Sequence, residues 1–204
     1  MKVVVILAHP DKGSFNHAIA LTCINTLAEN GHQIIFHDLY DEQFDPLLCH
    51  SEFYKKARLT ACVRKHCEQI SFADGIVIVH PNWWGQPPAI LKGWIDRVIR
   101  PGVAYEFVGG DKGEGVPRGL LKARSAIVFN TSNTKSGREK RAFGDPLERI
   151  WKDCVFGLCG VRVFYRRMFN IVVASTERQR KKWLKETAGI INRYYPEKSR
   201  KKPS

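Results

Sequence analysis

A short polar turn follows the first apolar run of the chain. Residues 2–8 are dense in β-branched side chains and predict a buried strand, and the next residues read His9-Pro10-Asp11-Lys12-Gly13-Ser14-Phe15-Asn16. Gly13 permits a tight bend, Ser14 and Asn16 carry short polar side chains, and the start of the next helix supplies free backbone N–H groups. These parts indicate an anion site, with phosphate as its guest. A plain capped turn, with Ser14 as the helix N-cap, is the alternative.

Two adjacent tryptophans mark the loop after the third predicted strand. This loop reads Pro81-Asn82-Trp83-Trp84-Gly85-Gln86-Pro87-Pro88. A rigid aromatic loop at the carboxyl edge of a sheet suits a flat ring system. A hydrophobic plug or a contact between subunits is the alternative reading of the same residues.

A run of small polar residues follows the fourth predicted strand. It reads Asn130-Thr131-Ser132-Asn133-Thr134. Such side chains can donate several hydrogen bonds to one edge of a ligand. The same residue types are common in ordinary turns, which is the alternative.

Short apolar runs alternate with longer helical patterns along the chain. The predicted strands cover residues 2–8, 33–37, 75–80 and 124–130, with a fifth strand inside 161–173. The predicted helices cover residues 14–30, 51–72 (capped by Ser51), 88–99, a segment from the N-cap Asp145 to Gly160, and 176–195. This alternation predicts an α/β fold with a parallel sheet covered by helices on both faces.

The connections at residues 38–50, 101–119 and 132–144 are expected to be loops. In open α/β sheets, ligands bind beyond the carboxyl ends of the strands. The turns after the first, third and fourth predicted strands should therefore meet around one site. We expect a single domain over residues 1–197 and a basic C-terminal tail over 198–204.

The composition is ordinary for a soluble globular protein of 204 residues, with 44% hydrophobic and 26% charged residues. The longest apolar stretches fall far short of the roughly 20 residues of a membrane span. Asp11 and Lys12 closely follow the first apolar run and no small-residue cleavage site occurs, so a signal peptide is not expected. We expect a cytoplasmic protein without a transmembrane segment.

The net charge of +13 raises the question of an anionic partner. Residues 162–204 hold 13 Lys and Arg against 3 Asp and Glu, whereas the remaining residues hold 20 against 17. This terminal concentration favours a solvated helix face and tail, with weak contact to an acidic partner or a membrane surface as a further reading. No nucleic-acid-binding motif accompanies the charge, and nucleic acid is not expected as a partner.

The cysteines and most histidines show no ligand spacing. None of the six cysteines forms a C-x-x-C pair, and buried reduced thiols are expected, with no zinc site and no other metal. His32, His37, His50 and His66 are expected to be structural or exposed. His80 lies directly before the tryptophan loop and is therefore expected beside the site.

Taken together, these motifs resemble the flavodoxin-like family of NAD(P)H:quinone reductases. The matching residues are Ala8-His9-Pro10, Ser14-Phe15-Asn16 with Ala18, Asp38-Leu39-Tyr40 with Phe44 and Pro46, Pro81 with Trp84, and the stretch from Pro88 to Trp94. The match is specific over residues 2–130 and weaker beyond them.

The resemblance implies a five-stranded parallel sheet of order 2-1-3-4-5, a non-covalent flavin and a homodimer. It implies FAD, with FMN as the alternative, and NAD(P)H as co-substrate of an NAD(P)H dehydrogenase (quinone)-like oxidoreductase. The implied residues on the phosphate side of the flavin are His9, Ser14, Phe15, Asn16 and Ala18. Those along the flavin ring are Pro81, Asn82, Trp83 and Trp84, and those at its polar edge are Thr131, Ser132 and Asn133.

The segment after the fourth strand departs from the family pattern. The mammalian-type members of the family carry a Tyr and a His there that assist charge transfer, whereas residues 135–145 contain neither, and Phe143 stands about where the His would be. Arg138 or Arg141 is a candidate electrostatic replacement. The departure keeps a second hypothesis open, namely a flavin-binding ancillary subunit of a transport system with little turnover.

Overall fold

The computed structural model describes residues 1–54, 57–109, 115 and 117–197. Its centre is the predicted parallel sheet, with the strand order β2-β1-β3-β6-β7. This is the predicted order once β4 and β5, which form a separate two-stranded ribbon, are set aside. The strands of the sheet are β1 Lys2–Leu7, β2 Gln33–Asp38, β3 Gly75–Pro81, β6 Ser125–Ser132 and β7 Val163–Asn170. The ribbon pairs β4 Tyr105–Glu106 with β5 Arg118–Gly119.

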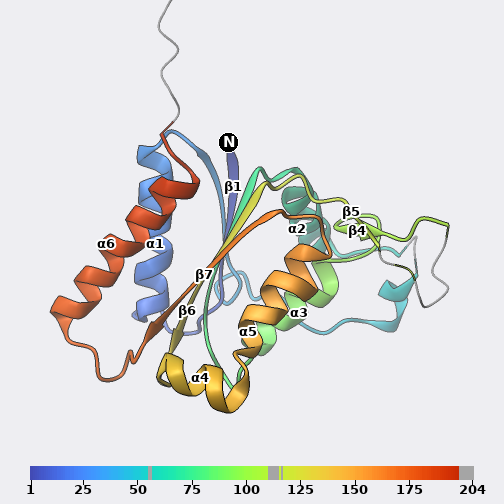
Figure 1. Ribbon diagram of the computed structural model, residues 1–204. Coiled ribbons are helices and arrows are strands. Elements are labelled where there is room, and N and C mark those ends of the chain that lie inside the picture. Colours follow the sequence, from blue (N-terminus) through green and yellow to red (C-terminus); the bar gives the residue numbers. More distant parts are fainter. Residues whose placement is uncertain (55–56, 110–114, 116, 198–204) are drawn as a thin grey trace, which may run out of the picture.

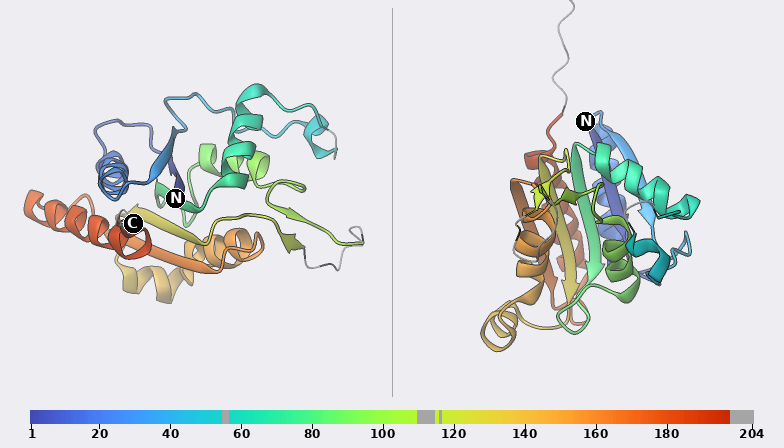
Figure 2. Two further views of the ribbon diagram at one scale, coloured as in Figure 1. Left: turned by 90° about the horizontal axis from the view of Figure 1, so that it is seen from above. Right: turned by 90° about the vertical axis from the view of Figure 1, so that its right-hand side faces the viewer.

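Helices cover both faces of the sheet (Figure 1). The helices are α1 Phe15–Glu29, α2 Ala61–Phe72, α3 Ala89–Val98, α4 Ser136–Phe143, α5 Pro146–Arg149, which runs into the π-helix η2 Ile150–Gly157, and α6 Glu177–Tyr194. Helices α1 and α6 lie side by side on one face, and α2, α3 and α5 lie on the other (Figures 1 and 2).

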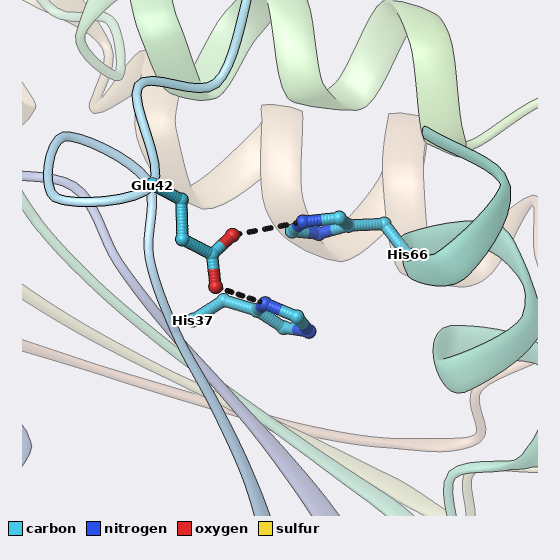
Figure 3. A group of neighbouring side chains, drawn as sticks. All are labelled: His37, Glu42 and His66. Carbon is cyan, nitrogen blue, oxygen red and sulfur yellow. Dashed lines mark hydrogen bonds and ion pairs between the residues drawn. The ribbon is translucent and has the colours of Figure 1, made fainter. Parts of the chain in front are cut away.

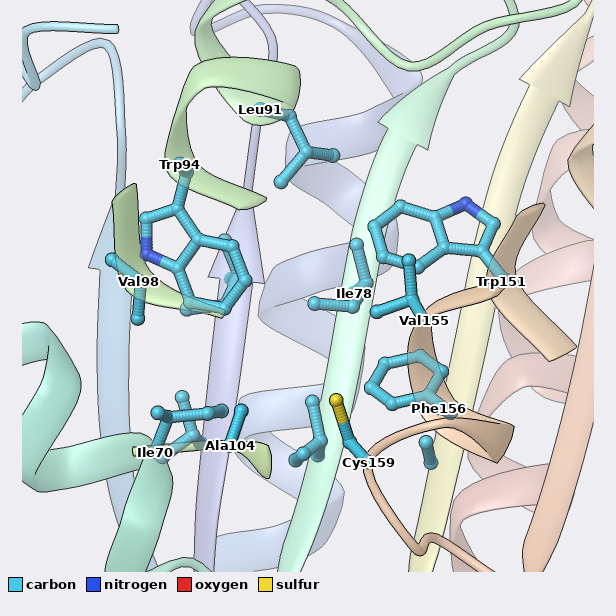
Figure 4. Close-up of a cluster of buried hydrophobic side chains, with 14 of the residues drawn as sticks. Ile70, Ile78, Leu91, Trp94, Val98, Ala104, Trp151, Val155, Phe156 and Cys159 are labelled. Atoms are coloured by element: carbon cyan, nitrogen blue, oxygen red, sulfur yellow. The ribbon is translucent and has the colours of Figure 1, made fainter. Parts of the chain in front are cut away.

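The hydrophobic core has two halves because successive side chains of a strand point to opposite faces. Val3 and Val5 of β1 pack with α1 and α6, whereas Val4 and Ile6 pack with the other helices. In the half of the core opposite α1 and α6, Ile78 of β3 lies among large side chains of α3 and η2 (Figure 4). These two layers hold the strand ends, and with them the turns that follow, in fixed positions.

The predicted helix over residues 51–72 is wrong in its first half. Helix α2 begins only at Ala61, where the Thr60 side chain accepts a hydrogen bond from the Val63 N–H at 3.3 Å. The upstream residues form the short 3-10 turn η1 His50–Phe53 instead of a helix capped by Ser51. Glu52 is buried against Arg97 of α3. This ion pair holds η1 against α3, so the residues of η1 do not continue α2 toward the N-terminus.

Two of the expected loops contain regular structure. Residues 132–144 include α4, which ends at Gly144 in the left-handed conformation that glycine favours. Residues 101–119 include the ribbon strands. Asp145 does lie at the N-cap of α5, but its carboxylate makes no capping hydrogen bond and pairs with Arg166 of β7 instead.

The cysteine prediction is correct for only half of the thiols. Cys23, Cys67 and Cys159 are buried, whereas Cys49, Cys62 and Cys154 are exposed, and all six are free. Burial raises the pKa of Cys67 and of Cys159 to about 11, so these two thiols are inert. The predicted tail over 198–204 lies outside the described residues. Within the described part of the chain, no helix combines the length and the apolarity needed to cross a membrane.

Candidate functional site

A cavity of about 770 Å³ lies where β1, β3 and β6 end. All of the predicted site residues except Ala18 line it: His9, Ser14, Phe15, Asn16, Pro81, Asn82, Trp83, Trp84, Thr131, Ser132 and Asn133. Ala18 is not among the lining residues; its N–H donates to Ser14 O at 3.3 Å in the first turn of α1. The fold therefore brings together three turns, of which the first and the last are more than a hundred residues apart in sequence.

The turn after β1 forms one end of this cavity. Ser14 caps α1, because its side-chain oxygen accepts a hydrogen bond from the His17 N–H. The Asp11 N–H lies 3.1 Å from His9 Nδ1, and the same ring nitrogen lies 3.3 Å from Asp11 O. Burial lowers the pKa of His9, and the neighbouring His17 adds to this effect. A neutral imidazole N–H, a hydroxyl and a helix N-terminus thus meet at this end.

Asn16 and Thr131 connect two walls of the cavity. The Asn16 Nδ2 donates to Thr131 Oγ1 at 3.0 Å, and the Thr131 hydroxyl lies 3.3 Å from Asn16 Oδ1. Both side chains are buried although they are 115 residues apart in sequence. Their hydrogen bonds fix the turn after β1 against the end of β6.

The polar side chains after β6 are engaged with the protein itself. Ser132 Oγ accepts from the Thr134 N–H at 3.0 Å and lies 3.4 Å from Glu139 Oε1, while Asn133 Oδ1 accepts from the Val173 N–H at 2.9 Å. The sequence reading treated these side chains as donors to a ligand. In the structure they shape the wall of the cavity.

The tryptophan loop is a tight two-residue turn. Trp83 and Gln86 exchange backbone hydrogen bonds of 3.0 and 2.9 Å, and the residues between them, Trp84 and Gly85, have φ values of 56° and 72°. Positive φ at both central positions defines a type I′ turn. A Cβ atom on Gly85 would lie 2.9 Å from the Pro146 side chain, so the turn packs closely on α5. This conformation leaves the Trp84 side chain fully exposed.

Glu139 is a buried cavity residue that the sequence reading missed. It comes from α4, in a segment predicted to be a loop, and is only 3% exposed. Its Oε1 accepts a hydrogen bond from Asn82 Nδ2 at 3.0 Å and joins the loop after β3 to the wall after β6. Gly144, a typical residue at the C-terminal end of a helix, is the one local signal of the helix that carries Glu139. Arg138 and Phe143 also line the cavity, with the guanidinium 5.8 Å from the ring centroid.

His80 lies in the core and not at the site, contrary to the prediction. Its Nε2 accepts a hydrogen bond from Trp151 Nε1 at 3.0 Å, and its Nδ1 faces Pro81 O at 2.7 Å. Burial lowers the pKa of His80 to about 4, so the ring is neutral. The strand alternation turns this side chain toward α5 and η2, away from the cavity.

A second titratable cluster, formed by His37, Glu42 and His66, lies outside the cavity (Figure 3). Glu42 Oε1 lies 2.7 Å from His37 Nδ1, and Oε2 lies 3.0 Å from His66 Nε2. The sequence showed no ligand spacing for either histidine, because β2 and α2 bring them together only in the fold. One ligand atom from each residue lies within 4.8 Å of the others, so the group has the composition of a metal site.

The donor pattern of this cluster favours hydrogen bonds over a metal ion. Trp94 Nε1 donates to His66 Nδ1 at 3.0 Å, so the neutral ring carries its proton on Nε2, facing Glu42. A metal at Nε2 would move that proton to Nδ1, directly against the Trp94 N–H. Metal-bound histidines instead donate their second N–H to an acceptor.

The cluster makes the stability of the protein depend on pH. Burial raises the pKa of Glu42, but the hydrogen bonds from His37 and His66 outweigh it and hold the pKa at about 2. Burial lowers the pKa of His66 below its ordinary value. Both folded-state values lie below the unfolded ones, so this stabilisation is present at neutral pH and is lost as the pH falls.

We therefore expect Glu42→Gln to lower the Tm at about pH 7 and to reduce the further loss of Tm between about pH 5 and pH 3. Thermal unfolding followed by circular dichroism measures both effects. Glu177→Gln, which removes an exposed carboxylate paired with Lys181, is the matched control and should change neither. Equal acid sensitivity of Glu42→Gln and the wild-type protein would contradict the assignment.

Comparisons with known proteins agree with this architecture. A family model described as a flavodoxin-like fold matches residues 1–189. A Haemophilus influenzae protein named an uncharacterized NAD(P)H oxidoreductase is 32% identical over 188 residues, which cover 89% of this chain and 89% of that protein. The rat ribosyldihydronicotinamide dehydrogenase [quinone] is 28% identical, with 88% and 86% covered.

A solved structure adds a further likeness in fold. It is an FMN-dependent NADH-azoreductase from Bacillus anthracis in complex with FMN, with a TM-score of 0.77 and 17% identity. The likeness covers 95% of this chain and 99% of that protein.

Proposed function

The chain belongs to this flavodoxin-like family of NAD(P)H oxidoreductases, and from that premise we propose that it binds a flavin in the cavity and passes a hydride from NAD(P)H through it to a quinone or a similar acceptor. The observation that carries the proposal is the meeting of three turns around one cavity, one turn suited to an anion and one to a flat ring. The similarity in sequence to the rat relative supports the quinone as acceptor, because that protein is named a dehydrogenase [quinone].

The lining of the cavity fits a phosphorylated flat-ring cofactor. His9, Ser14 and the N-terminus of α1 offer donors to phosphate at one end. Trp83, Trp84 and Phe143 supply aromatic surface elsewhere along the same cavity. Its volume of about 770 Å³ lies in the range of small-molecule sites. Ala18 contributes through the first turn of α1 and not by contact with the ligand.

A bound flavin supplies the hydride chemistry, and the protein supplies position and electrostatics. The hydrogen bonds between Asn16 and Thr131 hold the turn after β1 at a fixed distance from the end of β6. The phosphate end and the ring end of the cavity therefore keep a fixed separation. Asn82 is held by Glu139 in one amide orientation, because a carboxylate only accepts hydrogen bonds. The aromatic side chains exclude water from the ring region.

Either FAD or FMN is compatible with this proposal. The sequence motif resembles the FAD-binding quinone reductases, whereas the Bacillus anthracis neighbour is an FMN complex. Extraction of the flavin from the purified protein and its identification by chromatography decide between the two.

We also propose that the active species is a homodimer. Large hydrophobic side chains stand exposed near the cavity and on the segment before α2: Trp84, Leu47, Phe53 and Tyr54. A second copy of the chain is the expected cover for them. Light scattering on the protein as it elutes from a size-exclusion column measures its mass directly.

The alternative of an ancillary transport subunit is not favoured, because the relatives described above are named as oxidoreductases.

The absorption spectrum of the purified protein tests the main proposal. We expect the visible bands of oxidised flavin, uptake of FMN or FAD by flavin-free protein, and bleaching on addition of NADH or NADPH. Thr131→Val should weaken flavin binding, because it removes the hydrogen bond that holds the turn after β1 against the end of β6, and it should lower the free energy of unfolding by about 1–3 kcal/mol, because the buried Asn16 amide loses its partner. Thr22→Val, the same substitution on α1 at a position that does not line the cavity, is the control. Failure to take up either flavin would refute the proposal.

A further inference from the structure

A hydrogen-bonded chain runs from the end of β2 into the phosphate end of the cavity. Asp38 Oδ2 lies 3.0 Å from His17 Nε2, and His17 Nδ1 lies 3.0 Å from Ser14 Oγ. The His17 and Asp38 side chains are only 13% and 11% exposed. His17 has no place among the sequence-predicted site residues and does not line the cavity, so its effect on a ligand passes through Ser14.

The hydrogen-bond donors around Asp38 settle one end of this chain. Its Oδ1 accepts hydrogen bonds from the N–H groups of Tyr40 and Asp41 at 3.1 and 3.3 Å. A carboxylate with these contacts only accepts, so His17 Nε2 carries a proton and donates it to Asp38. The state of the other ring nitrogen, Nδ1, therefore decides the total charge of His17.

The direction of the Ser14 hydrogen bond depends on that charge. In the neutral ring, Nδ1 is an acceptor, and the Ser14 hydroxyl proton points at His17, so Oγ offers no donor to the cavity. In the imidazolium, Nδ1–H donates to Ser14 Oγ, which frees the hydroxyl proton to point into the cavity. A phosphate oxygen needs a donor, so it favours the second state both by hydrogen bonding and by charge.

We propose that His17 takes up one proton when a phosphate group binds at the N-terminus of α1, and that this proton turns the Ser14 hydroxyl toward the phosphate. His17 is then a positioning residue for the phosphate of the cofactor. The proposal rests on the proposed flavin site. The tests below distinguish an error in the flavin assignment from an error in the proton linkage. No other atom is transferred; the proton comes from the buffer.

Other charged and titratable groups face His17 from the elements around it. The turn after β1 contributes His9, whose ring centroid lies 6.3 Å from that of His17. Asp41, whose N–H donates to Asp38, pairs with Lys12 at the surface. His9 is the competing proton acceptor, but its pKa is lowered by burial.

Calorimetric titration with FAD in buffers of different ionisation enthalpy measures the proton uptake. The diphosphate of FAD does not titrate near neutral pH, whereas the phosphate of FMN has a pKa of about 6, so FAD is the cleaner probe. We expect net uptake approaching one proton at pH values at which an ordinary imidazole is neutral. The FAD dissociation constant should then rise by up to about tenfold per pH unit.

Three variants assign the proton. His17→Asn places an amide N–H near Nδ1, so it should bind FAD with no proton uptake and no pH dependence. His17→Phe removes the donor and should weaken FAD binding at every pH. His9→Asn tests the competing proton acceptor: it changes a donor that lines the cavity and should weaken FAD binding, but it should retain the proton uptake. Uptake that survives His17→Asn, or FAD binding with no uptake in the wild-type protein, would overturn the proposal.

Sulfate separates this proposal from the flavin assignment, because it carries no titratable proton near neutral pH. The NMR signals of the His17 ring should move toward the imidazolium values when sulfate is added. A shift with sulfate but no flavin uptake would leave the proton linkage intact and refute only the flavin function. No shift with sulfate and none with FAD would refute the linkage itself.

Discussion

Arg97→Met should lower the free energy of unfolding by about 3 kcal/mol or more, because it strips a buried carboxylate of its main partner. The Arg97 side chain is 2% exposed, and its Nη2 and Nε contact the two carboxylate oxygens of Glu52 at 2.5 and 3.2 Å. Its Nη1 donates to Asp45 O at 2.6 Å. The bidentate contact raises the pKa of Arg97, so the cation persists at all working pH values. Urea unfolding at neutral pH measures the loss.

An exposed ion pair of the same chemistry supplies the control. Arg118 pairs with Glu106 on the surface ribbon, where the two side chains are 67% and 38% exposed. Arg118→Met should therefore cost less than about 1 kcal/mol. The double variant Arg97→Met with Glu52→Gln should recover part of the loss, because the orphaned charge is gone. Similar small losses in both arginine variants would contradict the buried-pair account.

Gly93→Ala should be severely destabilising although alanine is the better helix former. A Cβ atom at Gly93 of α3 would lie 2.2 Å from Pro46 O and 2.4 Å from Pro46 Cα. Both are backbone atoms that cannot rotate away, so either α3 or the segment before η1 must move. Overpacking of this kind typically costs about 1–3 kcal/mol, and contact with backbone places the expected loss at the upper end.

The same substitution at Gly189 of α6 should change the free energy of unfolding in the opposite direction. Nothing lies within 4 Å of a Cβ atom built there, so Gly189→Ala should stabilise the protein by up to about 1 kcal/mol. The two substitutions are chemically identical and both lie in helices. Urea unfolding of both variants should give shifts of opposite sign. Stabilisation by Gly93→Ala would show that the segment around Pro46 does not lie against α3.

The sheet could be predicted because its signal is local. Each strand of the core is a short β-branched or apolar run flanked by helical spacing, and that alternation alone implies parallel strands with helical crossovers. The edge at which ligands bind follows from the same topology. The turns at residues 9–16, 81–88 and 130–134 were therefore placed together correctly, and the structure brings them around one cavity.

The remaining features depend on contacts between distant residues. The pair of Glu52 and Arg97 decides where the helix before β3 begins, and no local pattern reveals it. His37 and His66 lie on different elements, and only the packing of α2 on the sheet brings them to Glu42. Strand alternation should have placed His80 with the core side chains, but its position before the tryptophan loop drew attention to the site instead.

The wall of the cavity also depends on contacts that sequence patterns do not reveal. Thr131 was selected as a polar residue facing a ligand, but its partner is Asn16, and this hydrogen bond is invisible in either segment alone. Glu139 was missed because a short helix of mixed charge does not show a clear apolar face. Sequence patterns predict which turns meet at one cavity, and the fold determines which of their polar atoms are hydrogen-bonded to one another.

The type I′ turn at Trp84 and Gly85 has a consequence for protein engineering. Asparagine followed by glycine is the pair that this turn prefers, and a bulky residue at the left-handed position costs on the order of 1 kcal/mol. A redesign that optimises thermostability alone would exchange Trp84 first and gain from it. The same exchange would delete the indole that the proposed function places beside the cofactor. Selection for heat tolerance and selection for turnover should thus favour different residues at this position.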